Sequence, residues 1–174
     1  MIKKILLALV GIIVLVIAGF FALGLLFPTL NSETRVTINK PRDVVWAYFV
    51  DQKNLSNWLP NVKSIENISG EPMTAGSKFK ITFEEDGREI VMTETMTEVK
   101  EKEVFGFILE NEVMKANARI SFIDKGNQTE VVENNTFEGG NIFWKSLFVL
   151  MKSSIAGNSQ KAYDKLKAHI ENIK

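Results

Sequence analysis

The feature that most constrains this chain is an uninterrupted apolar run near its N-terminus. Residues 5–27 read ILLALVGIIVLVIAGFFALGLLF, 23 residues without a charged, amide or hydroxyl side chain. A helix of that length extends about 35 Å, enough to cross a hydrocarbon core of about 30 Å. A helix in the core of a soluble domain would normally show a polar face. The run therefore predicts one transmembrane helix over 5–27.

A cleaved signal peptide is the competing interpretation of the same run. Signal peptides normally have an apolar stretch of about 7 to 15 residues followed by a small-x-small cleavage site. Here the stretch is longer, and the small residues Ala18, Ala22 and Gly24 lie inside it. We therefore expect an uncleaved anchor, with a basic flank at 1–4 and a tether at 28–32.

The basic residues on either side of the run predict its orientation. Lys3 and Lys4 precede it and favour a cytoplasmic N-terminus, with the folded domain on the outer side of the cell membrane. Three basic residues after the run favour the reverse orientation: Arg35, Lys40 and Arg42. They lie within about 15 residues of its end, and positive charges that close to a transmembrane helix favour the cytoplasmic side.

Residues 33–174 have the length of one domain, and their charge excludes several functions. The chain has 21 basic and 21 acidic residues, so without Lys3 and Lys4 the balance is 19 − 21 = −2. A nearly neutral body argues against nucleic acid as a partner, because phosphate binding needs a basic face. There is no cysteine and only one histidine, so we expect no disulfide, no thiolate nucleophile and no metal site. No cofactor fingerprint is present either.

Hydropathy patterning predicts one strand, two short helices, six further strands and a long helix. Alternation of apolar and polar residues indicates the strands, and Asp86-Gly87 and Lys125-Gly126-Asn127 supply hairpin turns. Spacings of three and four indicate the last helix, with a bend expected near Gly157. The predicted strands are 34–38, 62–68, 78–85, 88–99, 104–110, 115–124 and 129–138, and the predicted helices are 41–51, 54–58 and 141–173.

This order of elements resembles the START-like superfamily, also called SRPBCC, which includes polyketide cyclases and dehydrases, lipid-transfer domains and pollen-allergen-like proteins. The similarity covers 33–174 and is strongest in VTINKPRDVVWAYFVDQKNLSNWLPNVKSIE, with its Trp58-Leu59-Pro60 element, and in Lys165-Leu166-Lys167. It implies an α+β helix-grip fold, in which a curved seven-stranded antiparallel sheet wraps around the long C-terminal helix. It also implies an internal cavity for lipids, sterols, polyketides or other apolar molecules.

Alternation along two strands predicts polar groups inside that cavity. If Met92 and Met96 face the cavity, Glu94 faces it too, and the same argument brings Glu133 and Asn135 to the inner face of the last strand. A bulge that shifts the register by one residue would instead send these side chains to solvent. The full set of expected cavity residues is Trp58, Met92, Glu94, Met96, Phe107, Ile120, Glu133, Asn135, Phe148, Met151 and Ile155.

The start of the last helix is unusually apolar. Residues 142–151 read IFWKSLFVLM, with apolar side chains almost all round. Two interpretations stay open: the segment is fully buried, or its outer side forms a cavity mouth or contacts a membrane or a partner.

We expect a membrane-anchored binder or carrier of a hydrophobic small molecule or lipid, without catalysis. One alternative is an enzyme similar to polyketide cyclases and dehydrases that moves protons with the cavity carboxylates. Another is a structural or interaction module of the cell envelope, in which the interior is closely packed.

Overall fold

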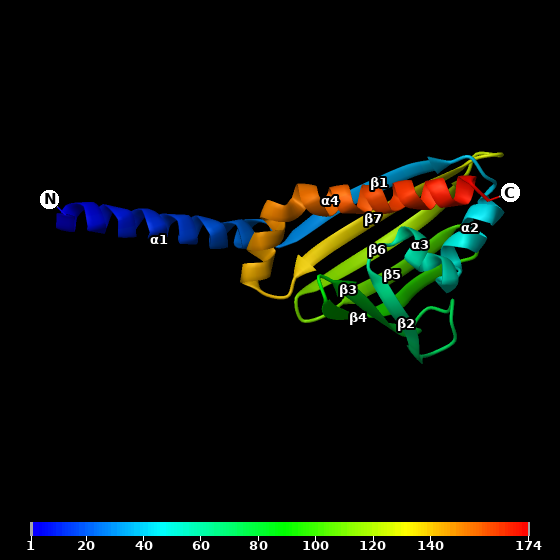
Figure 1. The fold of residues 1–174 in the computed structure, drawn as a ribbon, viewed down its shortest axis with the longest axis horizontal. Coiled ribbons are helices and arrows are strands. Elements are labelled where there is room, and N and C mark those ends of the chain that lie inside the picture. The colour runs from blue at the N-terminus through cyan, green and yellow to red at the C-terminus, as the bar shows by residue number, and fades with distance from the viewer. Residues whose placement is uncertain (1, 174) are drawn as a thin grey trace.

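The apolar run forms one helix, α1 (Ile2–Leu26), in the computed structural model, which describes residues 2–173. Figure 1 shows α1 as a straight rod that leaves one end of the domain. Every residue of α1 up to Gly19 is exposed, whereas Gly24 near its end is buried. The chain therefore carries one helix long and apolar enough to cross a membrane, and only its last turns contact the domain.

The seven strands form one antiparallel sheet in the order β1-β7-β6-β5-β4-β3-β2. Consecutive strands from β2 to β7 are neighbours, and β1 closes the other edge by pairing with β7. The expected α+β helix-grip fold is confirmed. The strands are β1 (Thr29–Ile38), β2 (Val62–Ser69), β3 (Lys78–Glu85), β4 (Arg88–Lys100), β5 (Val104–Glu110), β6 (Met114–Asp124) and β7 (Thr129–Gly139).

The prediction of a tether over 28–32 is wrong, because four of its five residues belong to β1. That strand begins at Thr29, five residues before the start predicted from the sequence, and Thr29 pairs with Glu138 of β7. The polar residues Asn31 and Ser32 resemble a linker in the sequence, but their backbone pairs along the sheet edge. Only two residues separate α1 from β1, so α1 is joined closely to the domain.

The last helix, α4 (Ile142–Glu171), is continuous and lies along β1 and β7. Asn141 caps its start, since its side-chain oxygen accepts hydrogen bonds from the backbone N–H groups of Phe143 and Trp144 at 3.0 and 3.2 Å. Figure 1 shows that α4 is bent, with its first turns beside the end of α1 running at a steep angle to the rest.

The register of β4 decides which side chains face α4. Asp86 and Gly87 both have positive φ angles, 50° and 75°, which is the geometry of a type I′ hairpin turn between β3 and β4. Regular pairing then continues from the turn past Glu94, which lies opposite Phe79. A bulge does occur in β4, but it falls after Met96, so it leaves Glu94 on the inner face.

Aromatic rings fill one end of the space between sheet and helices. Phe49 of α2 (Arg42–Val50) lies 5.1 Å from Phe122, 5.5 Å from Phe105 and 5.3 Å from Trp58, measured between ring centroids. Trp58 ends α3 (Leu55–Trp58), which follows the short 3₁₀ turn η1 (Gln52–Asn54). These rings form the main core, and the space beside them is left open.

Candidate functional site

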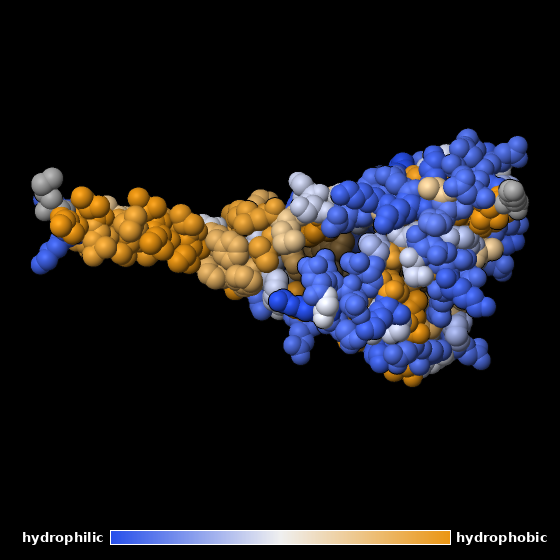
Figure 2. Space-filling view, in the orientation of Figure 1, coloured by the Kyte–Doolittle hydropathy of each residue, from blue (hydrophilic) through white to orange (hydrophobic). Residues whose placement is uncertain are grey.

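A cavity of about 380 Å³ lies between the concave face of the sheet and the helices α3 and α4. Ligand pockets in proteins usually measure about 300 to 1,000 Å³ and have apolar walls with a few polar groups. The walls here come from β2 to β7, from α2 and α3, from the β2–β3 loop and from the middle of α4. Figure 2 shows apolar side chains inside a hollow of the otherwise hydrophilic domain surface.

Most of the residues that the sequence places in a cavity do line this one. The seven are Trp58, Glu94, Met96, Phe107, Ile120, Glu133 and Asn135. Met92 is not among the lining residues, although it is buried on the same face of the sheet opposite Ile81. Whether any of these side chains contacts a ligand stays a prediction.

Three residues of α4 that were expected in the cavity do not line it: Phe148, Met151 and Ile155. The cavity therefore does not open near Phe148 and Met151. The bend in α4 turns its first turns toward α1 and away from the sheet. The helix reaches the cavity further along, through Ser159, Ala162 and Tyr163.

Glu133 is the buried carboxyl of the cavity, with only 8% of its surface exposed. Burial raises the pKa of Glu133 to about 7, because the charged form loses its hydration, and a hydrogen bond from Asn135 opposes this shift. The Asn135 amide donates to a Glu133 carboxyl oxygen at 3.4 Å, a long and therefore weak bond. The hydroxyl of Tyr163 has a raised pKa, first from burial and then from the nearby Glu133 charge. Glu133, Asn135 and Tyr163 thus form a polar cluster in an apolar wall.

Glu94 lies on another part of the wall and is only partly buried, because it faces the open space. Burial raises its pKa to about 7, and no hydrogen bond opposes the shift. Among the described residues that line the cavity, none is Lys, Arg or His. Both glutamates therefore lack a positive partner there that would lower the pKa again.

Two polar atoms of the lining have no hydrogen-bond partner. The Trp58 indole N–H and the Asn135 side-chain oxygen are both buried and unpaired. An unpaired buried donor or acceptor costs free energy, so such atoms usually meet water or a ligand. Both atoms belong to residues of the cavity lining but lie beneath its accessible surface.

Several lining residues are not predicted from the sequence. Leu55 comes from α3, Leu59 from the residue directly after it, Met73 from the β2–β3 loop, and Tyr163 from α4. The position of Met73 could have been noticed in the sequence, because an apolar side chain inside the turn-rich segment between Gly70 and Gly76 indicates a loop residue that packs inward. Tyr163 adjoins the apolar stripe of α4, but its phenol could equally have faced solvent.

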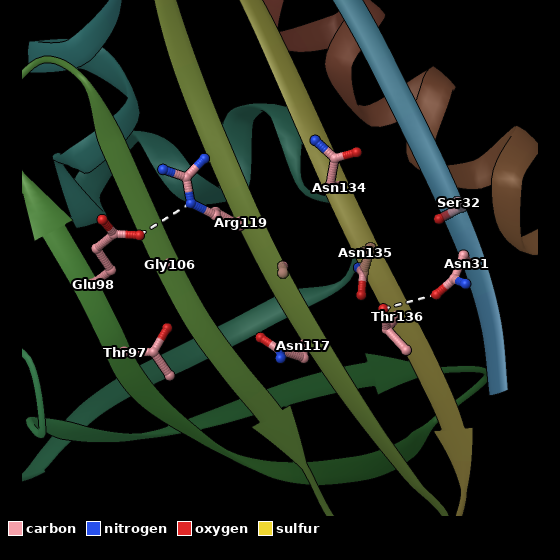
Figure 3. Close-up of a pocket in the computed structure, with 11 residues that line it drawn as sticks. Asn31, Ser32, Thr97, Glu98, Gly106, Asn117, Arg119, Asn134, Asn135 and Thr136 are labelled. Atoms are coloured by element: carbon pink, nitrogen blue, oxygen red, sulfur yellow. Dashed lines mark hydrogen bonds and ion pairs between the residues drawn. The ribbon is translucent and has the colours of Figure 1, made fainter.

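A second hollow, of about 350 Å³, lies on the outer face of the sheet and differs in character. Figure 3 shows its amide, hydroxyl and charged side chains projecting from β1, β4, β6 and β7. Several of these groups already satisfy one another, as in the Arg119–Glu98 ion pair at 3.0 Å and the Thr136–Asn31 hydrogen bond at 2.9 Å. It is an open polar surface and offers an apolar ligand no enclosure. No group of three or more potential metal ligands occurs among residues 2–173.

Solved structures with the same fold match the domain at low sequence identity. Ara h 8.0201 superposes with a TM-score of 0.65 at 14% identity, over 82% of this chain and 97% of that one. TTHA0849 from Thermus thermophilus superposes with a TM-score of 0.66 at 18% identity, over 81% of this chain and 97% of that one. The Zhui aromatase/cyclase from Streptomyces sp. R1128 gives 0.67 at 13% identity, over 82% and 94%. At these identities the likeness concerns the fold alone.

The sequence itself matches a family model over residues 29–171, which run from the first residue of β1 to the last residue of α4. No curated protein sequence matches the chain. The match covers the entire sheet and the helix that it grips. The chain therefore belongs to the polyketide cyclase / dehydrase and lipid transport family.

Proposed function

We propose that this protein is a membrane-anchored binder or carrier of an apolar small molecule, which it holds in the cavity between the sheet and α4. The observation that carries the proposal is the partly open apolar cavity of about 380 Å³ with a few inward polar groups. An interior meant only for stability would be filled to native density, because a void forfeits packing contacts.

The polar groups of the cavity favour a neutral ligand that bears a hydroxyl or carbonyl group. A ligand hydroxyl could donate to the unpaired oxygen of Asn135, or accept from the Trp58 indole, once a small side-chain movement brings either atom to the cavity surface. A carboxylate or phosphate would be repelled by Glu94 and Glu133 and would find no basic partner among the lining residues. Neutral sterol-like, polyketide-like or long-chain alcohol molecules fit this chemistry.

The anchor in this proposal is α1, and its support is its length, composition and exposure. Lys3 and Lys4 support a cytoplasmic N-terminus, with the domain on the outer side of the membrane.

A single cysteine introduced at the exposed Lys161 of the cysteine-free chain tests this orientation. A membrane-impermeant maleimide should label it on intact cells or spheroplasts, and labelling only after lysis would reverse the orientation. The intact mass of the membrane-bound protein should include residues 1–27, and their absence would indicate a cleaved signal peptide.

The binding proposal is tested by identifying what the protein carries. The full chain is transferred from its membranes into nanodiscs without detergent, and the bound molecules are extracted and analysed by mass spectrometry. An Ala116→Phe variant, whose new ring fills the cavity beside Leu109 and Phe137, shares α1 and its surrounding lipid and so serves as the matched control. We expect a neutral apolar compound enriched in the wild type. The same compounds in equal amounts from both proteins would contradict the proposal.

A second candidate function is proton transfer on a bound substrate, as in the cyclase or dehydrase members of the family. The specific observation in its favour is the pKa of about 7 for Glu94 and Glu133, near the optimum for a general acid or base at neutral pH. Exchange of acidic C–H protons of a bound β-diketone in D₂O, followed by NMR, tests it. Exchange that is equally fast with the wild type, Glu94→Gln and Glu133→Gln would end this candidate.

A further inference from the structure

The first turns of α4 have an apolar face that, among the described residues, α1 contacts at Phe143 and that is otherwise largely open. Phe143, Leu150 and Met151 are 47%, 63% and 42% exposed. With about 100° of rotation per residue, these three and Leu147 share one side of the helix, whereas Lys145 and Lys152 share the opposite side. Lys145 is fixed there by an ion pair with Glu138 at 2.9 Å. The segment 142–152 thus has one open apolar side, and its two lysines lie on the opposite side.

This apolar face begins at the surface of α1. Gly24 is buried so tightly that a side-chain Cβ there would lie 2.5 Å from the Ser146 hydroxyl and 2.8 Å from the Ile142 carbonyl oxygen. Four residues earlier, the Phe20 ring lies 5.6 Å from the Phe143 ring, measured between centroids. Figure 2 shows the apolar surface running without a break from α1 onto the adjoining part of the domain.

The position of the contact along α1 sets the depth of this face. Phe20 lies seven residues before the end of the apolar run, which corresponds to about 10 Å of helix. A run of about 35 Å exceeds a hydrocarbon core of about 30 Å only slightly, so Phe20 lies below the outer boundary of any bilayer that α1 crosses. Phe143, packed against Phe20, then lies at the same depth.

We propose that residues 142–151 of α4 lie in the interface of the bilayer that α1 crosses, with Phe143, Leu147, Leu150 and Met151 toward the acyl chains and Lys145 and Lys152 toward water. Amphipathic helices with apolar and basic sides bind membranes in this way. The inference rests on the proposed anchoring by α1. It adds a second membrane contact, which together with α1 fixes the tilt of the domain relative to the bilayer.

The absence of native cysteine allows a depth measurement residue by residue. Single cysteines replace Leu150 and Met151 on the open face, Lys152 on the opposite face and Lys161 further along α4, and Leu9 in α1 serves as an internal standard. Each variant is labelled with NBD and reconstituted into phosphatidylcholine/phosphatidylglycerol vesicles with or without doxyl-labelled lipid. All four α4 sites are exposed, so labelling leaves the fold intact, and circular dichroism verifies it.

We expect doxyl lipid to quench NBD at Leu9, Leu150 and Met151 at least twofold more than at Lys152 and Lys161. Strong quenching at Leu9 with equally weak quenching at all four α4 sites would overturn the interfacial contact and leave the anchor standing. Blue-shifted emission at Leu150 without quenching would also overturn it, because a second copy of the chain, and not lipid, would then cover the face. Absence of quenching at Leu9 would contradict the anchor itself.

Discussion

Glu94 and Glu133 face the same cavity, but β5 and β6 lie between their strands, so the two carboxyls do not form a pair. Three strand spacings of about 4.8 Å put roughly 14 Å of sheet between them. Each carboxyl is therefore raised in pKa by its own burial and not by the charge of the other. This arrangement gives two separate polar spots in an apolar wall, as a binding cavity would have, and no shared-proton dyad.

The raised pKa of Glu133 makes the stability of the domain depend on pH. A carboxyl whose pKa rises from 4.5 to about 7 on folding stabilises the protein fully below about pH 4.5, and this stabilisation is lost as the pH rises through 7. At 1.36 kcal/mol per pKa unit the effect is about 3 kcal/mol. We therefore compare the unfolding free energies of Glu133→Gln and the wild type at pH 5 and at pH 8 by urea denaturation. From pH 5 to pH 8, the difference between them should shift by about 2–3 kcal/mol in favour of the variant.

The control for that measurement is Glu85→Gln, at an exposed position on β3. It should leave the pH dependence of the wild type unchanged. If Glu133→Gln and Glu85→Gln gave parallel stability curves between pH 5 and 8, Glu133 would not be a buried, protonated group in the folded protein.

Gly24 allows α1 and α4 to touch, and a methyl group there should force them apart. The nearest atoms to a new Cβ include the Ser146 backbone nitrogen and the Ile142 carbonyl oxygen, both at 2.8 Å, which cannot rotate away. Overpacking of this kind costs about 1–3 kcal/mol. We expect Gly24→Ala to speed amide hydrogen exchange of the first turns of α4 at least fivefold in nanodiscs. Gly19→Ala, where nothing lies within 4 Å, is the matched control, and equal exchange in the two variants would refute the contact.

The unpaired indole N–H of Trp58 should matter for ligands that carry a hydrogen-bond acceptor. Trp58→Phe keeps an aromatic ring beside Phe49 and removes the donor. A hydrogen bond contributes about 0.5–1.5 kcal/mol, so we expect the variant to bind a long-chain alcohol about 3- to 10-fold more weakly than the wild type and the matching alkane almost equally. Calorimetric titration with the two compounds compares them. An equal loss for both would mean that Trp58 acts through its shape alone.

Local patterns in the sequence predict most of the fold. The strands 78–85 and 104–110 are correct at both ends, because alternation and turn residues such as Asp86-Gly87 are encoded within a few neighbouring positions. The inward direction of Glu94 is correct because regular pairing runs from that turn and the bulge in β4 comes only after Met96.

The errors lie where distant segments decide the structure. The start of β1 depends on pairing with β7, which lies about 100 residues away, so Asn31 and Ser32 gave no local sign of a strand. The cavity residues expected at Phe148 and Ile155 depend on where α4 bends and on its contact with α1 at Gly24. Helical periodicity identifies the apolar side of such a helix but not the element it meets.

The claim that the cavity holds an apolar ligand is tested most directly by titration with the neutral probe 1-N-phenylnaphthylamine. Its fluorescence should rise to saturation with about one probe per wild-type chain in nanodiscs, and Ala116→Phe should weaken binding at least tenfold. Thr95→Phe adds the same ring to the outer face of β4 and should bind as the wild type does. Saturable binding that all three proteins share equally would place the probe outside the cavity and contradict the account.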